Sequence, residues 1–381
     1  MSAAELARRL HDDLTVPLAV RPRVLEVPAT DESRLWALSG ADRLTGYRDG
    51  PAPEVCGQAA SATLAALAVA GAYLGAPLPG VEVLGERART SGMQRNAPFS
   101  AGGAFRCLPA RDGWFGLSLA RAWDREVLPA LTRSDPVTAP WDAVRSWLRD
   151  TAVQDALARA VDLQLPAAVV PPRPLPERRR PVEVTPGGPR KQSSRPTIVD
   201  LSALWAGPLC ARLLRMAGAR VVKVESSDRP DGARLGPPAF FRLMHAGHEF
   251  VQLDFRRQRA ELHALVASAD VVIEGSRPRA LAGLGIDAHE HVASGTIWAS
   301  VTAYGRQGAD ANRVGFGDDV AVGAGLLAWT GAGPVPAGDA LADPLAGVHA
   351  AAAVAVALAS ERGSLLDVSM HDTARRAAAV T

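Results

Sequence analysis

The sequence predicts an α/β fold for residues 197–381, centred on an open, doubly wound parallel sheet, with a smaller α+β domain placed N-terminal to it. Three observations predict the sheet: short apolar runs, helical apolar spacing between these runs, and glycine or polar residues where elements stop. Strands that alternate with helices imply crossover connections, which give a parallel sheet covered on both faces.

The helices follow from apolar spacing. After the first apolar run, Leu209, Leu213 and Leu214 share one helical face, and Gly218 marks the end of that helix. A second helix is expected over 260–269. Such sheets bind ligands beyond the carboxyl ends of their strands, so a site is expected there. Strands are expected at 197–201, 220–225, 250–255, 270–274 and 296–305.

Composition describes an ordinary soluble globular protein. The chain has 381 residues, a hydrophobic fraction of 48% and a formal net charge of +2, so composition favours neither a nucleic-acid nor a membrane partner. Three widely spaced cysteines suit a reducing compartment, and the charged N-terminus has no apolar signal-peptide core. We therefore expect a cytoplasmic protein. The Ala-rich segments 59–74 and 345–359 are short, which favours buried helices over membrane spans.

Residues 171–196 read PPRPLPERRRPVEVTPGGPRKQSSRP and predict a linker. They are rich in Pro, Arg and Gly and show no apolar periodicity. The basic residues could contact nucleic acid, but no aromatic residues are interleaved, so a solvated tether is favoured. The chain is thus divided into 1–170, the linker 171–196, and 197–381.

A dinucleotide-binding enzyme is not favoured. The first turn reads L-W-A-G-P and lacks the G-x-G-x-x-G fingerprint. Glu225 ends the second strand where such folds hold a ribose. That residue either touches a ribose or adenine or ends its strand in solvent.

Several segments together carry a family resemblance. They are IVDLSALWAGPLCARLLRMAGARVVKVESSDRPDGAR, FFRLMHAGHEFVQLDF, ADVVIEGSRPRALAGLGID, GFGDDVAVGAGLLAWTG and ADPLAGVHAAAAVAVAL. In this order and spacing, residues 196–380 resemble the class III (CaiB/BaiF-type) coenzyme A transferases, a family that also includes 2-methylacyl-CoA racemases. The resemblance implies a Rossmann-like CoA-binding catalytic domain, a CoA thioester and a carboxylic acid as substrates, no permanently bound cofactor, and a homodimer.

The resemblance makes Asp343 the expected nucleophile. By sequence alone, Asp343 before an Ala-rich helix is better explained as a helix cap, although both roles share the helix N-terminus. A carboxylate can attack a thioester carbonyl and divide acyl transfer into easier covalent steps. The expected intermediates are a mixed anhydride and an aspartyl-CoA thioester. Each step develops an oxyanion, so N–H donors are expected nearby.

The resemblance also implies CoA-binding residues. Arg277 stands in the segment that in the family reads N-F-R-P-G and lies near the CoA phosphates or adenine. Lys223 is expected near the adenosine pocket or, as the alternative, at an exposed strand end. The remaining candidates are Glu225, Arg234, near a phosphate-contacting arginine of the family, and Tyr304 with Gly305, in the turn beside CoA.

Two departures change the expected pocket. The family's N-x-G-K-R-S motif appears here as HAGHEF (245–250), which loses two positive charges. His245 and His248 could act as acid–base or metal residues, but no metal ligand is expected. Trp205 stands where formyl-CoA transferase has a Gln, so the acyl pocket is expected to differ, with Phe316 as a further pocket residue.

The racemase branch of the family is less favoured. Its members pair the aspartate with a histidine, and the corresponding stretch here contains Phe316, which cannot exchange a proton. CoA transfer is therefore the leading function. An acyl-CoA racemase or isomerase and a non-catalytic acyl-CoA-binding protein remain the alternatives. The donor and acceptor acids cannot be read from the sequence.

The N-terminal half resembles the family's smaller domain, which normally follows the doubly wound domain. Segments 84–131 and 140–170 carry this likeness, and a hairpin is expected at Asp112. Gly102 and Gly103 match a glycine-rich loop that closes over the acyl group in relatives, or they form a plain turn. Residues 36–74 also echo 320–358, with Gln58 opposite Asp343, which suggests a degenerate half-repeat. Tandem fusion and permutation both explain this order, and whether the dimer is interlocked is left open.

Overall fold

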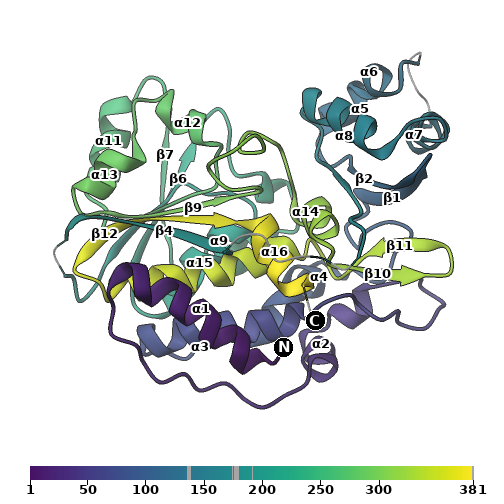
Figure 1. Cartoon of the computed structure of the whole chain (residues 1–381). Coiled ribbons are helices and arrows are strands. Elements are labelled where there is room, and N and C mark those ends of the chain that lie inside the picture. The colour runs from purple at the N-terminus through teal and green to yellow at the C-terminus, as the bar shows by residue number, and fades with distance from the viewer. Residues whose placement is uncertain (135–138, 174, 176–179, 191, 380–381) are drawn as a thin grey trace.

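A seven-stranded sheet lies at the centre of the computed structural model (Figure 1). The structure describes residues 1–134, 139–173, 175, 180–190 and 192–379. Six strands run parallel and the edge strand β4 pairs antiparallel with β12. The spatial order is β4-β12-β9-β8-β5-β6-β7. The strands are β4 (Val182–Pro189), β5 (Thr197–Asp200), β6 (Arg220–Ser226), β7 (Glu249–Leu253), β8 (Val271–Glu274), β9 (Ile297–Thr302) and β12 (Arg362–Ser369).

This arrangement confirms the predicted mixed α/β fold and each of the five predicted strands. The chain starts the parallel sheet at β5, moves outward to β6 and β7, and then returns to the other side of β5 for β8, β9 and β12. That is the strand order of doubly wound nucleotide-binding sheets, in which the crevice between the first and fourth strands receives ligands. Here β5 and β8 flank the crevice.

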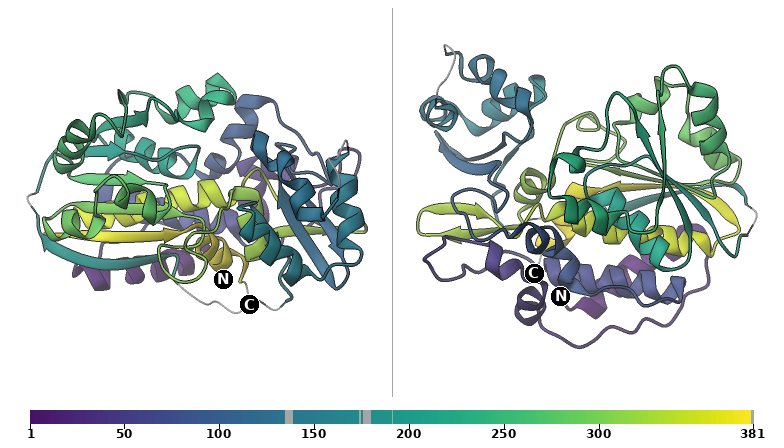
Figure 2. Two further views of the ribbon diagram at one scale, coloured as in Figure 1. Left: turned by 90° about the horizontal axis from the view of Figure 1, so that it is seen from above. Right: turned by 180° about the vertical axis from the view of Figure 1, so that it is seen from behind.

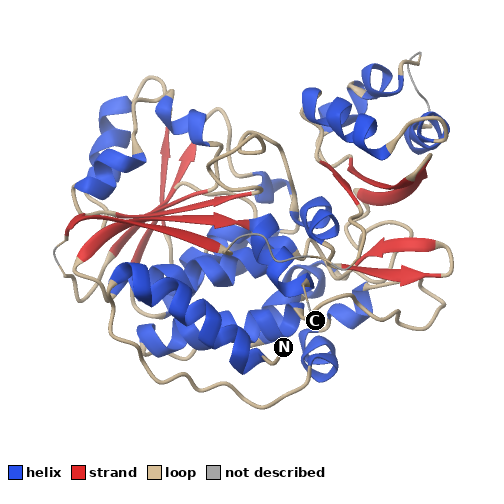
Figure 3. Ribbon diagram, in the orientation of Figure 1, coloured by secondary structure: helices blue, strands red, loops and turns tan. Residues whose placement is uncertain are grey.

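Helices cover both faces of the sheet (Figures 1 and 3). Successive strand residues point to opposite faces, so Ile297 joins the core on one side and Trp298 the core on the other. The first face carries α1 (Ala3–Leu18), α3 (Ala59–Leu74), α9 (Ala206–Met216) and α15 (Ala342–Leu358), and the second carries α11 (Arg259–Ala267), α12 (Pro278–Ala282) and α13 (Ala288–Ala293).

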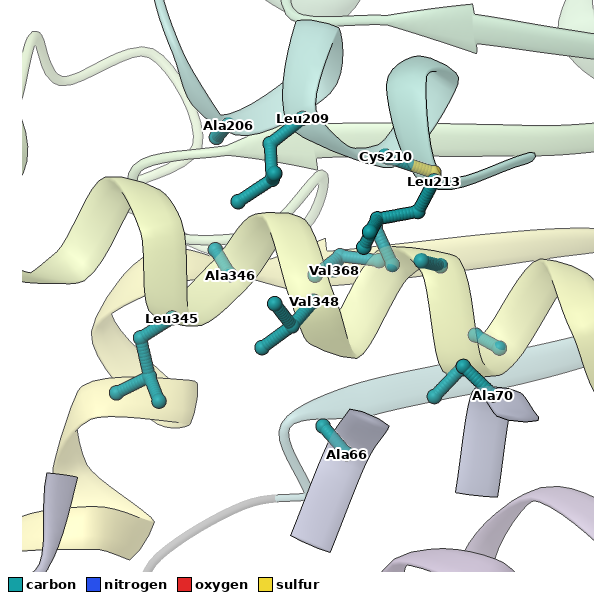
Figure 4. Packing of buried hydrophobic residues seen from close by; sticks show 14 of the residues in the cluster. Ala66, Ala70, Ala206, Leu209, Cys210, Leu213, Leu345, Ala346, Val348 and Val368 are labelled. Carbon is teal, nitrogen blue, oxygen red and sulfur yellow. The ribbon is translucent and has the colours of Figure 1, made fainter. Parts of the chain in front are cut away.

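The Ala-rich helix α15 is the centre of the larger core. It lies between α9 and α3, and Figure 4 shows Ala346 and Val348 in this packing. Small side chains let the helices approach closely: a Cβ at Gly347 would lie 2.6 Å from the carbonyl oxygen of Ala206. The two Ala-rich segments are therefore buried helices, as predicted. Within the described residues, no helix is long and apolar enough to span a membrane.

A smaller unit stands beside the main body, next to the hairpin formed by β10 and β11 (Figure 2). Its antiparallel sheet has the order β1-β2-β3, and the turn at Asp112 joins β1 to β2 as predicted. Leu108, Phe115 and Leu148 belong to its own core. The elements are β1 (Phe105–Ala110), β2 (Gly113–Ser118), α5 (Ala122–Glu126), α6 (Leu128–Thr132), α7 (Pro140–Leu148), α8 (Val153–Asp162) and β3 (Ala167–Val169).

The hydrophobic cores divide the chain differently from the predicted domain boundaries. Side chains from residues 6–84 pack in the same core as α9 and α15, so much of the expected N-terminal domain belongs to the main body. Strand β4 lies inside the segment 171–196 that was predicted as a linker, so the prediction was wrong there. Val182 is buried while Glu183 is exposed, as in a half-buried strand. Pro186 and Pro189 are tolerated there because β4 is an edge strand. Linker residues 174, 176–179 and 191 lie outside the described residues.

The remaining elements connect the two units and frame the site. They are α2 (Glu32–Ser39), α4 (Glu86–Ser91), α10 (Pro238–Met244), α14 (Gly317–Ala324), α16 (Met370–Ala378), β10 (Leu327–Thr330), β11 (Gly333–Pro336) and the 3₁₀ turns η1 (Ala41–Leu44), η2 (Val81–Leu84) and η3 (Gly232–Leu235). Helix α14 contacts strands of the smaller unit on one side and α15 on the other.

Candidate active site

Asp343 lies in the first turn of α15, against the N-terminus of α14. The backbone N–H of Gly317 donates a hydrogen bond to its carboxylate. A Cβ at Gly317 would lie 2.4 Å from Asp343 Oδ2 and 2.2 Å from the carbonyl oxygen of Ala340. Only glycine therefore allows this approach. The Asp343 side chain itself is half-buried, so it keeps contact with the outside of the protein.

Arg87 brings a positive charge from the N-terminal half of the chain to this carboxylate. It lies in α4 and makes a two-pronged ion pair with Asp339, with Nε 2.8 Å from Oδ2. Asp318 and Asp343 also lie close enough to raise the pKa of the guanidinium further. One cation is therefore shared by three carboxyl groups.

The aspartates that face Asp343 are held by specific donors. Asp318 Oδ1 accepts the Ala340 N–H at 2.9 Å, and its carboxyl also accepts the Ser100 hydroxyl. Ala340 takes a left-handed backbone conformation, with φ of 43°, in the turn before α15. The chain therefore turns sharply to bring Asp339 and Asp343 to the same place.

Asp319 lies behind this group, on α14. Its Oδ1 accepts the Ser118 hydroxyl and the Phe316 N–H, each at 3.0 Å. The other oxygen, Oδ2, is buried without a hydrogen-bond partner among the described residues. Ser118 ends β2, so the smaller unit also contributes to this acidic cluster.

Burial raises the pKa of Asp343 to about 7. The neighbouring Asp318 and Asp339 raise it further, whereas Arg87 and the Gly317 N–H oppose the rise. Burial likewise raises the pKa of Asp318 to about 6 and that of Asp319 to about 7. The cluster consequently exchanges protons near neutral pH.

Three of the predicted pocket residues surround this cluster. The Trp205 ring centre lies 5.1 Å from the Arg87 guanidinium carbon, and a Cβ at Gly102 would lie 3.6 Å from Arg87 Nη2. Phe316 directly precedes α14 and its ring lies 5.7 Å from the Arg121 guanidinium carbon. Gly103, with φ of +78°, completes the turn that follows Gly102. Trp205 is buried, so its ring is part of the packed protein that borders this cluster.

Arg277 lies in a group of four arginines contributed by both units. Its Nη1 donates to Gln164 Oε1 at 2.5 Å, across the boundary to the smaller unit. Burial lowers the pKa of Arg277, and the nearby charges of Arg279, Arg229 and Arg121 lower it further. Such clustered guanidinium groups are suited to bind phosphates.

Lys223 does not face solvent, contrary to the alternative left open by the sequence. Its ammonium is 1% exposed, lies 3.2 Å from Asp231 Oδ2 and 3.6 Å from Asp200 Oδ2, and donates to the Ser202 carbonyl. These contacts give Lys223 a structural role in joining β5, β6 and the turn before η3.

Glu225 and Arg234 form an ion pair at 2.8 Å. Although burial opposes it, the hydrogen bonds from Arg234 and the Asp231 N–H lower the pKa of Glu225. The Arg234 guanidinium lies 4.3 Å from the centre of the Phe241 ring and stays partly exposed. Arg234 is therefore open to a ligand, while Glu225 positions it.

Tyr304 and Gly305 lie beside the loop that leads into α14. The Tyr304 ring is stacked by the Arg313 guanidinium at 4.2 Å, and a Cβ at Gly315 would lie 3.3 Å from that ring. Burial raises the pKa of the Tyr304 hydroxyl. Gly305 adopts φ of +85°, which favours glycine in this turn.

Four residues of this site were not predicted from the sequence: Arg87, Asp318, Asp319 and Asp339. The acidic pairs in GFGDD and GDALAD were a readable signal, and the second precedes the predicted Ala-rich helix. Arg87 gave none, because 252 residues separate it from its partner Asp339. Two surface cavities, of about 300 and 330 Å³, lie elsewhere, against α13 and α11, so the site is defined by these side chains and not by those cavities.

Comparisons with known proteins identify the family of the C-terminal half. Residues 196–381 match the model of CoA-transferase family III. A protein named acyl-CoA transferase from Fusarium pseudograminearum is 31% identical over 202 residues, covering 46% of this chain and 44% of that protein. The succinate–glutarate CoA-transferase of Agrobacterium fabrum is 29% identical over 200 residues, covering 46% and 50%.

The solved structures include a CaiB/BaiF family protein from Brucella suis, which is 29% identical with a TM-score of 0.43 and covers 47% of this chain and 53% of that one. The chain spans about half the length of the curated relatives it matches. The family match begins just before β5 and includes Asp343. Through residues 196–381, the chain belongs to CoA-transferase family III, as its sequence predicted.

Proposed function

We propose that the protein transfers CoA from an acyl-CoA thioester to a carboxylic acid through a covalent aspartyl-CoA intermediate on Asp343. The observation that carries this proposal is the placement of Asp343 at the start of α15, partly accessible and held between the Gly317 N–H and the charge of Arg87. The relatives named as succinate–glutarate and acetyl-CoA:oxalate CoA-transferases support the same reaction class.

The reaction divides into four displacements. The Asp343 carboxylate attacks the thioester carbonyl, the C–S bond breaks, and CoA thiolate leaves a mixed anhydride. The thiolate then attacks the aspartyl carbonyl, which releases the first acid as its carboxylate and leaves aspartyl-CoA. The acceptor carboxylate attacks this thioester, the C–S bond breaks to release CoA thiolate again, and a second anhydride forms with Asp343. The thiolate finally attacks the acceptor's acyl carbonyl, which yields the new acyl-CoA and frees Asp343.

The acidic cluster favours these steps electrostatically. Each covalent intermediate replaces the Asp343 carboxylate by a neutral acyl group, which removes one negative charge from beside Asp318 and Asp339. The raised pKa also makes Asp343 a more basic, hence stronger, nucleophile than an ordinary carboxylate. The Gly317 N–H, which meets the ionised carboxylate, is placed to stabilise the oxygen on which negative charge develops.

The four-arginine group gives CoA a binding surface. Arg277, Arg279, Arg229 and Arg121 would hold its phosphates, and the partly exposed Arg234 would contact the nucleotide end. The acyl group would be surrounded by the Trp205 ring, Phe316 and the turn at Gly102 and Gly103. Bound substrate would thus cross between the two units of the chain. A homodimer remains a prediction, to be checked by light scattering.

Trapping the intermediate tests this proposal. The protein is incubated with succinyl-CoA or acetyl-CoA, quenched and digested, and the peptide containing Asp343 is weighed by mass spectrometry. We expect a CoA adduct on that peptide in the wild type, its absence in Asp343→Asn, and an unchanged adduct in Asp155→Asn, where an exposed aspartate of α8 is replaced.

Turnover separates the alternatives. Thioester exchange is measured with glutarate, oxalate and a panel of other acids, in the wild type and in Asp343→Asn. Deuterium incorporation at the α-carbon without an acceptor acid would instead identify a racemase or isomerase, and tight binding of acyl-CoA without exchange would identify a binding protein. CoA exchange that persists in Asp343→Asn would contradict the proposed nucleophile.

A further inference from the structure

A second group of chemically active side chains lies outside the Asp343 cluster, at the carboxyl end of β5. Asp200 ends this strand, and His245 and His248 flank the turn between α10 and β7. All three are buried, with 0%, 4% and 9% exposure. One ligand atom from each lies within 4.8 Å of the others. The turn depends on Gly247, whose φ of +76° lets the chain bring the two imidazoles together edge to face, with their ring centres 5.3 Å apart.

The polar atoms of this group are unusually short of partners. Asp200 Oδ2, His245 Nε2, His248 Nε2 and Asp231 Oδ2 are all buried without a hydrogen bond among the described residues. Buried polar atoms are nearly always satisfied. The two carboxylate oxygens face the Lys223 ammonium, but the two imidazole Nε2 atoms have no hydrogen-bond partner among the described residues, which indicates that an unseen ligand completes this group.

The charge balance points to a cation. Two carboxyl groups, Asp200 and Asp231, share the single ammonium of Lys223, at 3.6 and 3.2 Å. The nearby Arg215 guanidinium donates instead to the Gly247 carbonyl at 3.0 Å, on the outer side of the turn. The interior of the group therefore holds more negative than positive charge, which burial makes costly.

We propose that Asp200, His245 and His248 bind a divalent metal ion of the zinc type. Two imidazole nitrogens and one carboxylate oxygen are a ligand set that zinc prefers, with a fourth position left for water or another group. The two histidine Nδ1 atoms lie 3.2 Å apart. Adjacent ligands of a tetrahedral zinc ion, each about 2.0–2.1 Å from the metal, are separated by about 3.3 Å.

The surroundings of the three ligands also match a metal site. Asp200 Oδ1 accepts the Ser202 N–H at 2.9 Å, which fixes the carboxylate and leaves Oδ2 available. Asp231 Oδ2 lies 3.9 Å from His245 Nε2, where it can receive the other ring N–H once Nδ1 holds the metal. Carboxylates in this outer position are usual partners of metal-bound histidines. The metal would tie the end of β5 to the α10–β7 turn.

Metal content and a spectroscopic probe test the proposal on the full chain. The wild type, produced with zinc in the medium and dialysed, should retain about one zinc ion per chain by mass spectrometry of the elements. The conservative variants His245→Gln and His248→Gln should lose it. His289→Gln, which replaces an exposed histidine of α13, should retain it.

A measurement on the unaltered chain guards against variants that fold poorly. The metal-free wild type is titrated with Co²⁺, and one equivalent should produce the visible absorption of a tetrahedral nitrogen–oxygen site. Saturating Zn²⁺ should raise the Tm of the wild type by about 5 °C or more. These readouts do not use CoA transfer, so they also apply to Asp343→Asn. A wild type without stoichiometric metal and without the Co²⁺ spectrum, or full zinc retention in both histidine variants, would overturn the proposal.

Discussion

Replacing Arg87 by Met is the sharpest test of the electrostatics around Asp343. Arg87 is the cation that Asp339 binds directly and that also lowers the pKa of Asp343. The methionine keeps an unbranched apolar side chain beside the Trp205 ring but removes the charge. Three carboxyl groups would then face one another without this cation, so we expect the pKa of Asp343 to rise above its value of about 7.

The size of the shift follows from the charge that is lost. At an effective dielectric constant near 20, a unit charge in close contact with another contributes about 4 kcal/mol. Arg87 pairs directly with Asp339 and acts on Asp343 as a neighbour, so about half of that value, about 2 kcal/mol, applies to Asp343. One pKa unit corresponds to about 1.4 kcal/mol. The pKa of Asp343 should therefore rise by about 1–2 units, which lowers the ionised fraction at pH 7 by about 5–50-fold.

Rapid-quench measurement of aspartyl-CoA formation between pH 5.5 and 9.5 checks this shift. The wild-type rate should rise through pH 7, because only the ionised carboxylate attacks. In Arg87→Met the midpoint should move upward by about 1–2 units, so that most of the lost rate returns at high pH. Arg89→Met replaces an exposed arginine on the same helix and should leave the midpoint unchanged. A midpoint that stays in place in a folded Arg87→Met protein would refute the reasoning.

Three further outcomes follow from the same cluster. Asp339→Asn removes a negative neighbour and frees Arg87, so the midpoint for aspartyl-CoA formation should fall by about one unit, opposite to Arg87→Met; an upward shift would contradict the proposed charge sharing. Gly317→Ala places a Cβ against Asp343 and should lower the free energy of unfolding by about 2 kcal/mol or more and abolish the adduct, whereas Gly331→Ala, with no neighbour within 4 Å, should leave both unchanged in urea unfolding and mass spectrometry. The raised pKa values of the buried aspartates mean that the folded state holds protons more tightly than the unfolded chain. Their contribution to stability should therefore be present below about pH 4 and be lost as pH rises towards 7. Urea unfolding at a series of pH values checks this, and an Asp343→Asn protein whose free energy of unfolding falls with pH as steeply as that of the wild type in this range would contradict it.

The sheet could be predicted from local sequence because each strand carries its own signal. Runs such as RVVKVE and DVVIE are apolar enough to lie between two helical layers, and their order along the chain restricts the topology. Strand β4 escaped because its signal, the short alternation VEVT, stands among prolines and glycines that normally mark loops. Those glycines are needed for packing: a Cβ at Gly188 would lie 1.9 Å from the carbonyl oxygen of Ala293.

The site residues that could be predicted are those whose signals lie close together in the sequence. Asp343 could be singled out because the helix start and the family resemblance lie in the same short segment. Arg87 and Ser118 could not be predicted, since their partners are distant in the sequence. Asp339 is 252 residues from Arg87, and Asp319 is 201 residues from Ser118. Lys223 was expected near CoA from the family resemblance, with an exposed strand end as the alternative. Its side chain is instead buried, because neighbouring segments that its own sequence does not describe cover that strand end.

The two halves of the chain depend on each other at the reacting centre. The family match covers Asp343 and the parallel sheet, but the charge that opposes the rise in the pKa of Asp343 comes from Arg87 in α4. The hydroxyls that hold Asp318 and Asp319 come from Ser100 and Ser118. Helix α15 is also buried against α3 of the N-terminal half. The matching segment alone would therefore expose an apolar helix face and leave the buried acids without their cation and donors. The proposed reaction requires that both halves meet around one carboxylate, and the order of the two halves along the chain does not change that meeting.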